Sequence, residues 1–189
     1  MSKSQLDYVF CPFCGKYLEN KTKEGKQWKK CYLCNWTHYP TPHIAVAAII
    51  TEVRQEDHQP CVLMVKRKRE PFAGTCMFPA GFLEYGEHPE EALTRETSEE
   101  TGLTVIRFNF LRIRKVTEKE DPRHPNHLLH FYHVSRAMGI VTNNDPDENS
   151  EVEWKSVNDK VEIGFPHHIE MFDQIKSRIF DYFDYDFKI

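Results

Sequence analysis

The stretch from Gly81 to Leu103, GFLEYGEHPEEALTRETSEETGL, limits what the chain can fold into more than any other segment. Pro89 suits the first turn of a helix, because a proline there loses no helical hydrogen bond. The glutamates after it favour the positive end of the helix dipole, and Gly102 suits the position just past the last turn. The segment therefore predicts a helix from about His88 to Thr101.

Three glutamates share one face of this predicted helix. Residues three and four apart lie on the same side of a helix, and Glu96, Glu99 and Glu100 have that spacing. Like charges on one stripe repel one another, and Arg95 alone cannot balance them. One interpretation is a solvated acidic face that pairs with Arg95. The other is a site for a divalent cation such as Mg²⁺, which prefers oxygen ligands.

The spacing of these charges and glycines resembles the Nudix box of Nudix hydrolases. The matching residues are Gly81, Glu87, Arg95, Glu96, Glu99, Glu100, Gly102 and Leu103. The resemblance implies an α/β fold, a Nudix-type α/β/α sandwich around a mixed sheet. It also implies hydrolysis of a pyrophosphate link in a nucleotide with Mg²⁺ or Mn²⁺ as the cofactor. Thr97 departs from the pattern, which usually has an aliphatic residue there, so we expect altered packing behind the helix.

The resemblance also implies roles for the acids of the box. We expect Glu99 and Glu100 to be the principal Mg²⁺ ligands. Glu96, the third acid on the same face, is expected to be either a ligand or the general base. Glu87 would complete the metal shell or orient it through water. Gly81 would provide its backbone carbonyl as a further ligand.

Two further roles concern residues around this metal site. The rigid guanidinium of Arg95 is expected to orient a carboxylate of the box rather than contact phosphate. The turn-rich acidic loop at 143–150 is followed by a predicted strand, and in the family such a loop often supplies another carboxylate. Glu148 or Glu151 could do so here, although acidic loops are often only solvated.

Four of the six cysteines occur as two CxxC pairs that are separated by sixteen residues. This spacing is typical of a zinc ribbon, because two tight turns with two thiolates each complete a tetrahedral Zn²⁺ site in a segment too small for a core of its own. Redox-active pairs or disulfides are the alternative. The expected ligands of a structural Zn²⁺ are Cys11, Cys14, Cys31 and Cys34.

The zinc ribbon is expected to form a separate domain at residues 1–42, with a Nudix hydrolase domain at 43–189. The proline-containing segment THYPTPH is predicted to be a stiff connector between them. Between the cysteine pairs, the lysine-rich segment ENKTKEGKQWKK is predicted to form a polar, hairpin-like excursion. A basic loop with a tryptophan can bind single-stranded nucleic acid, but more often it is simply solvated.

Hydrophobic patterns predict the rest of the second domain. The run IAVAAII within 43–51 is typical of a strand that is buried on both faces. Further strands are predicted at 61–68, 103–118, 127–138 and 151–157. A packing helix is predicted after Phe165, because apolar residues recur at helical spacing. These residues are Ile169, Phe172, Ile175, Ile179 and Phe183.

Histidines recur every third residue around the fourth predicted strand, at His124, His127, His130 and His133. On a strand this spacing alternates between the two faces. We therefore expect surface or substrate-loop histidines here rather than a second metal site.

Composition limits the classes of function. With 25 basic and 29 acidic residues, the chain has no overall charge that would draw it to nucleic acid or to an anionic membrane. We find no signal peptide and no run of eighteen apolar residues, so a cytoplasmic location is expected. The aromatic tail DYFDYDFKI suggests docking on the chain's own domain or a homodimer contact.

A zinc ribbon followed by a Nudix box is similar to the arrangement in NADH pyrophosphatases. Those enzymes carry the signature SQPWPFP after the box, whereas the corresponding region here reads VTEKEDPRHPNH. We therefore expect a small-molecule substrate in which a nucleoside diphosphate is linked to another group, with ADP-ribose as the first candidate. Two alternatives remain: an RNA 5′-pyrophosphohydrolase, or an interaction module of zinc-ribbon type with a regulatory Nudix domain.

Overall fold

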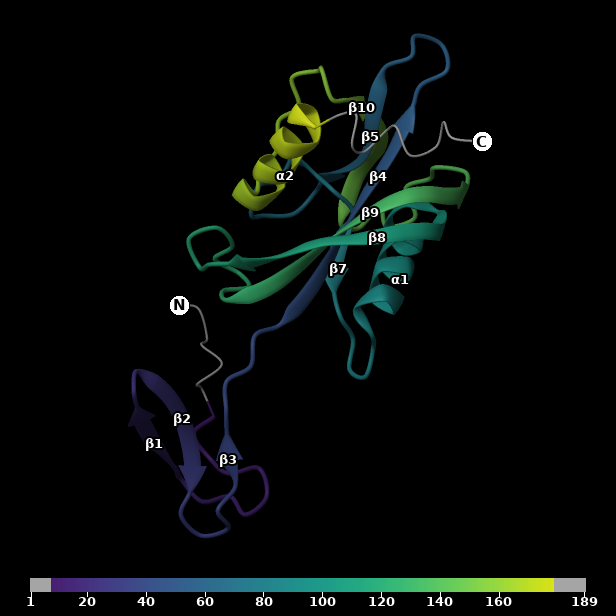
Figure 1. The fold of residues 1–189 in the computed structure, drawn as a ribbon. Coiled ribbons are helices and arrows are strands. Elements are labelled where there is room, and N and C mark those ends of the chain that lie inside the picture. The colour runs from purple at the N-terminus through teal and green to yellow at the C-terminus, as the bar shows by residue number, and fades with distance from the viewer. Residues whose placement is uncertain (1–7, 179–189) are drawn as a thin grey trace. The chain divides into compact units, whose positions relative to one another are not determined.

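The computed structural model describes residues 8–178. The chain divides into two compact units, and the boundary along the sequence lies between Pro42 and His43 (Figure 1). Ile179, Phe183 and the aromatic tail lie outside the described residues, so the expected dimer contact remains a prediction. Within 8–178, neither helix has the length and apolar character needed to cross a membrane.

The first unit contains a small antiparallel sheet. Its strands are β1 (Leu18–Lys23), β2 (Lys26–Cys31) and β3 (Thr37–His38), in that spatial order. Glu24 and Gly25 connect β1 to β2 with positive φ angles of 52° and 75°, as a tight two-residue hairpin requires. The lysine-rich segment is therefore a hairpin, as its composition indicated.

The second unit is built on a mixed, seven-stranded sheet. Its strands are β4 (Ile44–Val53), β5 (Pro60–Arg67), β6 (Cys76–Met77), β7 (Ala80–Phe82), β8 (Leu103–Val116), β9 (His127–Gly139) and β10 (Asn149–Ser156). The spatial order is β10-β5-β4-β9-β8, with β6 on β5 and β7 on β4. The β4–β9 pair is parallel and the other pairs are antiparallel. Each strand predicted from the hydrophobic pattern is present.

Two helices cover the opposite faces of this sheet, α1 (Pro89–Thr101) and α2 (Pro166–Ser177) (Figure 1). Consecutive residues of β4 contribute to different cores. Ala47 belongs to the cluster that contains Met171 of α2, and Ala48 belongs to the cluster that contains Leu93 of α1. This alternation confirms the prediction of a strand buried on both faces and the α/β/α sandwich.

Helix α1 has strong local signals at both ends. The His88 N–H donates to Glu91 at 2.8 Å, while the His88 ring accepts the N–H of Glu90 at 3.4 Å, which makes a capping box. Gly102 ends the helix in the left-handed conformation with φ 73°. These signals explain why the predicted bounds agree with the structure to within one residue.

Thr97 lies on the face of α1 that packs against the sheet. Its side chain is fully buried, and its Oγ1 has no hydrogen-bond partner among the described residues. One turn later, the buried Thr101 hydroxyl donates to the Thr97 carbonyl at 2.6 Å and accepts the Leu103 N–H at 3.3 Å. The departure from the family pattern therefore leaves a buried hydroxyl unsatisfied.

We expect Thr97→Val to raise the free energy of unfolding by about 1 kcal/mol, because an unsatisfied buried polar group costs roughly 1–3 kcal/mol. Thr101→Val is the matched control and should destabilise, because its hydroxyl makes two hydrogen bonds. Urea unfolding of both variants beside the wild type measures the difference. A Thr97→Val protein less stable than the wild type contradicts this interpretation.

Candidate active site and metal-binding residues

A cavity of about 330 Å³ lies in the second unit. Its walls come from β5, β7, α1, the segments that precede β9 and β10, and the start of α2. The acidic lining residues are Glu96, Glu99, Glu100, Asp121, Asp145 and Glu148. The other polar lining residues are Arg67, Arg69, Arg123, Asn149, His124, His127, His167 and His168. The cavity thus joins acids, arginines and histidines in one space.

The predicted acidic stripe faces this cavity. Glu96, Glu99 and Glu100 all come from α1 and all line it, as their helical spacing indicated. Glu99 is exposed, whereas Glu100 is only 5% exposed. The three carboxylates therefore differ in their access to water.

Glu100 connects α1 to two strands. Its carboxylate accepts the Ala80 N–H at 2.8 Å and the Asn149 Nδ2–H at 3.0 Å. Burial nevertheless raises the pKa of Glu100 to about 8. A cation bound beside Glu100 favours its ionised form, so metal binding there releases a proton.

Glu96 lies directly against Gly81. A Cβ added to Gly81 would be 2.0 Å from Cδ of Glu96, so no other residue fits beside this carboxylate in its present position. Burial raises the pKa of Glu96, although Arg95 donates a hydrogen bond to it at 2.8 Å. The box glycine therefore makes room for a box carboxylate.

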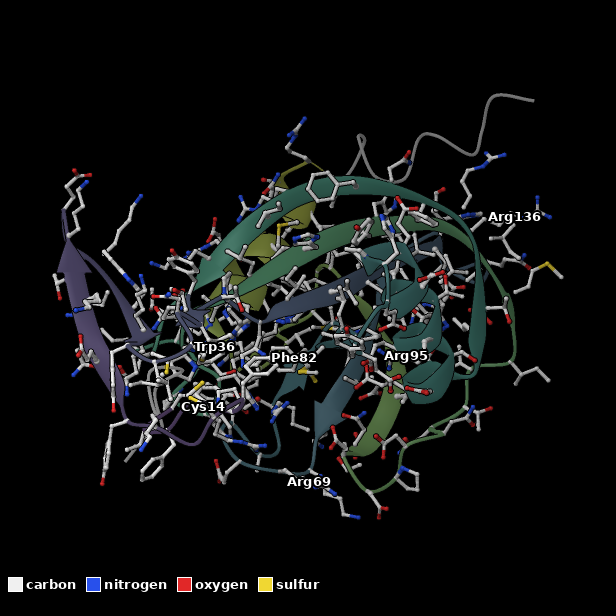
Figure 2. The ribbon with its side chains drawn as sticks, turned by 90° about the horizontal axis from the view of Figure 1, so that it is seen from below. Cys14, Trp36, Arg69, Phe82, Arg95 and Arg136 are labelled. Carbon is white, nitrogen blue, oxygen red and sulfur yellow. The ribbon has the colours of Figure 1, made fainter. Side chains whose placement is uncertain are left out.

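Arg95 holds the acids of the box together. Its guanidinium donates to both oxygens of Glu87, at 2.8 and 2.9 Å, and to Glu99 at 3.0 Å. Figure 2 shows Arg95 on α1, close to several carboxylate oxygens. The Arg95 hydrogen bonds and the Glu84 N–H lower the pKa of Glu87 to about 2. These contacts favour a positioning role for Glu87 over the expected role in the metal shell.

The acidic segment before β10 contributes two lining residues. Glu148 lines the cavity and pairs with Arg69 at 2.8 Å. Glu151 pairs with Lys66 at 3.2 Å and is not part of the lining. Asp145, which the sequence reasoning missed, also lines the cavity. Of the two proposed suppliers of an additional carboxylate, only Glu148 is close to the box acids.

Arg67 is a further residue that sequence reasoning missed. Its half-buried guanidinium donates to the Pro71 carbonyl at 2.9 Å and lies 4.9 Å from the centre of the Phe165 ring. None of the ion pairs found among residues 8–178 involves Arg67. Its charge is therefore available to an anionic ligand. Arg67 is one of four consecutive basic residues, so the sequence did not indicate which of them lines a cavity.

The four regularly spaced histidines do not converge on one site, although His124 and His127 both line the cavity. His127 lines the cavity, whereas His130 contacts the Phe110 ring, and Nε2 of His133 lies 2.9 Å from the Thr51 hydroxyl. His127 and His130 are an odd number of residues apart on β9, so they lie on opposite faces. Instead, His127 shares the cavity with His167 and His168 of α2, which sequence reasoning treated only as part of a packing helix.

The four cysteines of the first unit lie close together as free thiols. Three of the Sγ–Sγ distances are 3.5, 3.4 and 3.7 Å, and all four sulfurs lie within 4.8 Å of one another. Tetrahedral Zn²⁺ with bonds of about 2.3 Å places its sulfurs about 3.8 Å apart. Gly15 and Asn35 shape the two turns with positive φ angles of 69° and 58°. In the described chain, no other group of three such ligands converges as closely.

Comparison with known proteins identifies the family. The NUDIX domain family model matches residues 41–175, which is most of the chain. The protein therefore belongs to the Nudix domain family. A crystal structure of a MutT NUDIX hydrolase from Burkholderia pseudomallei has the same fold, with a TM-score of 0.61 and 24% identity over 71% of this chain and 98% of that one.

Curated relatives are named either as pyrophosphatases of ADP-ribose or ADP-sugars, or as NAD-capped RNA hydrolases. The chain is 32% identical over 150 residues to an ADP-ribose pyrophosphatase of Methanocaldococcus jannaschii, which covers 79% of this chain and 83% of the relative. It is 31% identical over 146 residues to the NAD-capped RNA hydrolase NudC of Edwardsiella ictaluri, which covers 77% of this chain. That match spans only 50% of the NudC relative.

We expect Gly81→Ala to displace the Glu96 carboxylate and to weaken Mg²⁺ binding with little loss of stability, because the clash involves the flexible end of a side chain. Thermal unfolding with and without Mg²⁺ measures both effects, since a ligand of the folded state raises Tm. The control is a double-mutant cycle with Glu96→Ala. If Gly81 acts through Glu96, the double variant responds to Mg²⁺ as Glu96→Ala alone does. Additive losses contradict that coupling.

We expect the purified protein to contain one zinc ion per chain by mass spectrometry. Cys31→Ser should lower the zinc content and expose residues 8–42 to protease, because Cys31 is a fully buried member of the cysteine cluster. Cys61→Ser is the matched control, since Cys61 is equally buried but lies in the second unit. A zinc-free protein with two disulfides contradicts the zinc interpretation.

Proposed function

We propose that this chain is a Mg²⁺- or Mn²⁺-dependent pyrophosphohydrolase. Its substrate is a nucleoside diphosphate joined to a second group, with ADP-ribose or an NADH-like molecule as the leading candidates. One observation carries the proposal: three glutamates of one helical face and three arginines line the same cavity. Carboxylates suit a hard cation, and guanidinium groups suit the oxygens of a diphosphate.

The acids of α1 fit a divalent cation. Their donor set consists of oxygen only, and Glu100 is buried with two neutral donors, so added positive charge stabilises it. We assign Glu99 and Glu100 as the principal ligands, with Glu96 and the Gly81 carbonyl beside them. When bound, the cation neutralises the diphosphate oxygens and lowers the repulsion that an attacking water meets.

The chain's own residues then have three tasks in hydrolysis. Arg67 and Arg123 attract the diphosphate, and Arg95 holds the box acids in place. A water oxygen bonds to phosphorus as the bond from that phosphorus to the bridging oxygen breaks. The proton of the water passes to a carboxylate, for which we propose Glu96 or Glu148 because both line the cavity.

The two units have separate tasks in this proposal. Residues 1–42 are a structural zinc ribbon, and residues 43–189 are the hydrolase domain that carries the whole cavity. A small cysteine-rich segment gains its stability from the metal, because it has too little core of its own. We place the protein in the cytoplasm, where such thiols stay reduced.

NAD-capped RNA is the second candidate substrate. The relationship to NudC supports it, as does the lysine-rich hairpin of the first unit. That hairpin carries Trp28 among five lysines, a combination that can contact a single strand by charge and stacking. In this case the same box chemistry cleaves the diphosphate of the cap.

A hydrolysis panel with Mg²⁺ tests the proposal. The substrates are ADP-ribose, NADH, nucleoside triphosphates, NAD-capped RNA and 5′-triphosphorylated RNA. We expect one diphosphate-linked nucleotide to dominate, and Glu99→Gln and Glu100→Gln to lower turnover by about 100-fold or more, because each removes a charged metal ligand.

Glu153→Gln is the matched control, because Glu153 pairs with Lys155 outside the cavity and should leave turnover unchanged. Circular dichroism of each variant excludes loss of fold as the cause. If both box variants keep wild-type turnover, the assignment of the metal ligands is wrong.

A further inference from the structure

One wall of the cavity is made of aromatic and imidazole rings. The His127 ring lies 5.3 Å from Phe82 and 6.3 Å from His167, and the His167 ring lies 4.9 Å from His168. All four residues line the cavity, and none of the three histidines belongs to the Nudix box. This imidazole wall, defined as His127, His167 and His168, has no role in the chemistry described above.

The three imidazoles of the wall are neutral. They are 4%, 3% and 2% exposed, in the order His127, His167 and His168. Burial lowers the pKa of each, and for His167 it does so to about 4. A neutral imidazole has one nitrogen that donates a hydrogen bond and one that accepts.

The contacts of Nδ1 determine which ring nitrogen donates a hydrogen bond and which accepts one. Nδ1 of His168 accepts the Phe78 N–H at 3.1 Å, so its Nε2 carries the proton and can donate. Nδ1 of His127 lies 2.6 Å from the His124 carbonyl and must donate to it, so its Nε2 can accept. Nδ1 of His167 is buried and has no partner among residues 8–178. The wall therefore offers a ligand a donor from His168 and an acceptor from His127, beside a third ring that has an unpaired buried nitrogen.

These features select among classes of ligand. Neutral imidazoles attract a phosphate less than the arginines of the same cavity do. Within the described chain, the three histidines do not form a group that converges as a metal site does. Phe165 next to them is only 6% exposed, with Phe72 and Arg67 against its ring, so it leaves little surface for stacking a base. Hydroxyl groups, which both donate and accept, fit best.

We propose that the imidazole wall binds the hydroxyls of a sugar attached to the second phosphate of the substrate. This inference rests on the proposed function, because the acids of α1 and the arginines must hold the diphosphate beside the wall. The cavity of about 330 Å³ is near the lower limit for small-molecule sites. This volume suits a diphosphate with one sugar. Binding of that sugar by the imidazole wall makes nucleoside diphosphate sugars better substrates than nucleoside triphosphates.

The test compares ADP-ribose with the methyl ester of ADP, in which a methyl group replaces the sugar. The variants are His127→Asn, His168→Asn and His167→Phe. Asparagine can keep the contact that Nδ1 makes with His124 or Phe78 while Nε2 is lost. His130→Asn is the matched control, because His130 lies on the same strand but outside the cavity.

We expect the wild type to prefer ADP-ribose in kcat/KM, and each wall variant to lower that preference by about 10-fold, as the loss of one or two hydrogen bonds predicts. The effect should fall mainly on KM for ADP-ribose, with kcat/KM for the methyl ester unchanged. His130→Asn should keep the wild-type preference. Equal losses on both substrates, or an unchanged preference in all three variants, overturns the proposal.

Calorimetric binding of the same two compounds to each protein separates the two proposals. If the enzyme is active but the wall variants do not change its preference for ADP-ribose, the proposed function stands and the sugar site is wrong. The protein could instead hydrolyse neither compound but bind ADP-ribose more tightly than the methyl ester, and only while the wall is intact. In that case the sugar site stands and the proposed function is wrong. Equal binding of both compounds by all proteins overturns the sugar site without reference to turnover.

Discussion

The buried carboxylate of Glu100 is the interaction on which the site depends. It joins α1 to β7 through the Ala80 N–H and to β10 through Asn149, so one carboxyl group fixes the relative positions of three elements. Two neutral donors do not offset the cost of burying an ionised carboxylate, as its raised pKa indicates. The positioning of α1 and the affinity for a cation therefore both come from the same buried carboxyl group.

Arg95 divides the acids of the box into two groups. Both oxygens of Glu87 are hydrogen-bonded to its guanidinium, whereas Glu96 and Glu99 each receive one hydrogen bond from it. Each of these two keeps an oxygen without a contact to Arg95. The single guanidinium of Arg95 thus positions these carboxylates without neutralising all of them. The remaining negative charge is available to a metal ion.

The parts of the molecule that could be predicted from sequence depend on short-range relations. Capping residues and i, i+3 spacing define α1 and its acidic face, and a CxxC pair places two thiols in one turn whatever the rest of the chain does. Asn149, Arg67 and His168 reach the cavity only because β10 pairs with β5 and α2 begins beside β6 and β7. No local pattern contains that information, so these residues were missed.

The same long-range packing gives the cavity three sides that differ in charge. Carboxylates of α1 form one side, arginines from the end of β5 and the loop before β9 form another, and the neutral imidazole wall forms a third. Burial lowers the pKa of His168, and the charge of Arg67 lowers it further. The arginine that attracts a diphosphate therefore also helps to keep the histidine uncharged. A substrate with an anionic part and a hydroxylated neutral part can then be oriented by charge, because the arginines and a cation on the acids of α1 attract its phosphates more strongly than the neutral imidazole wall does.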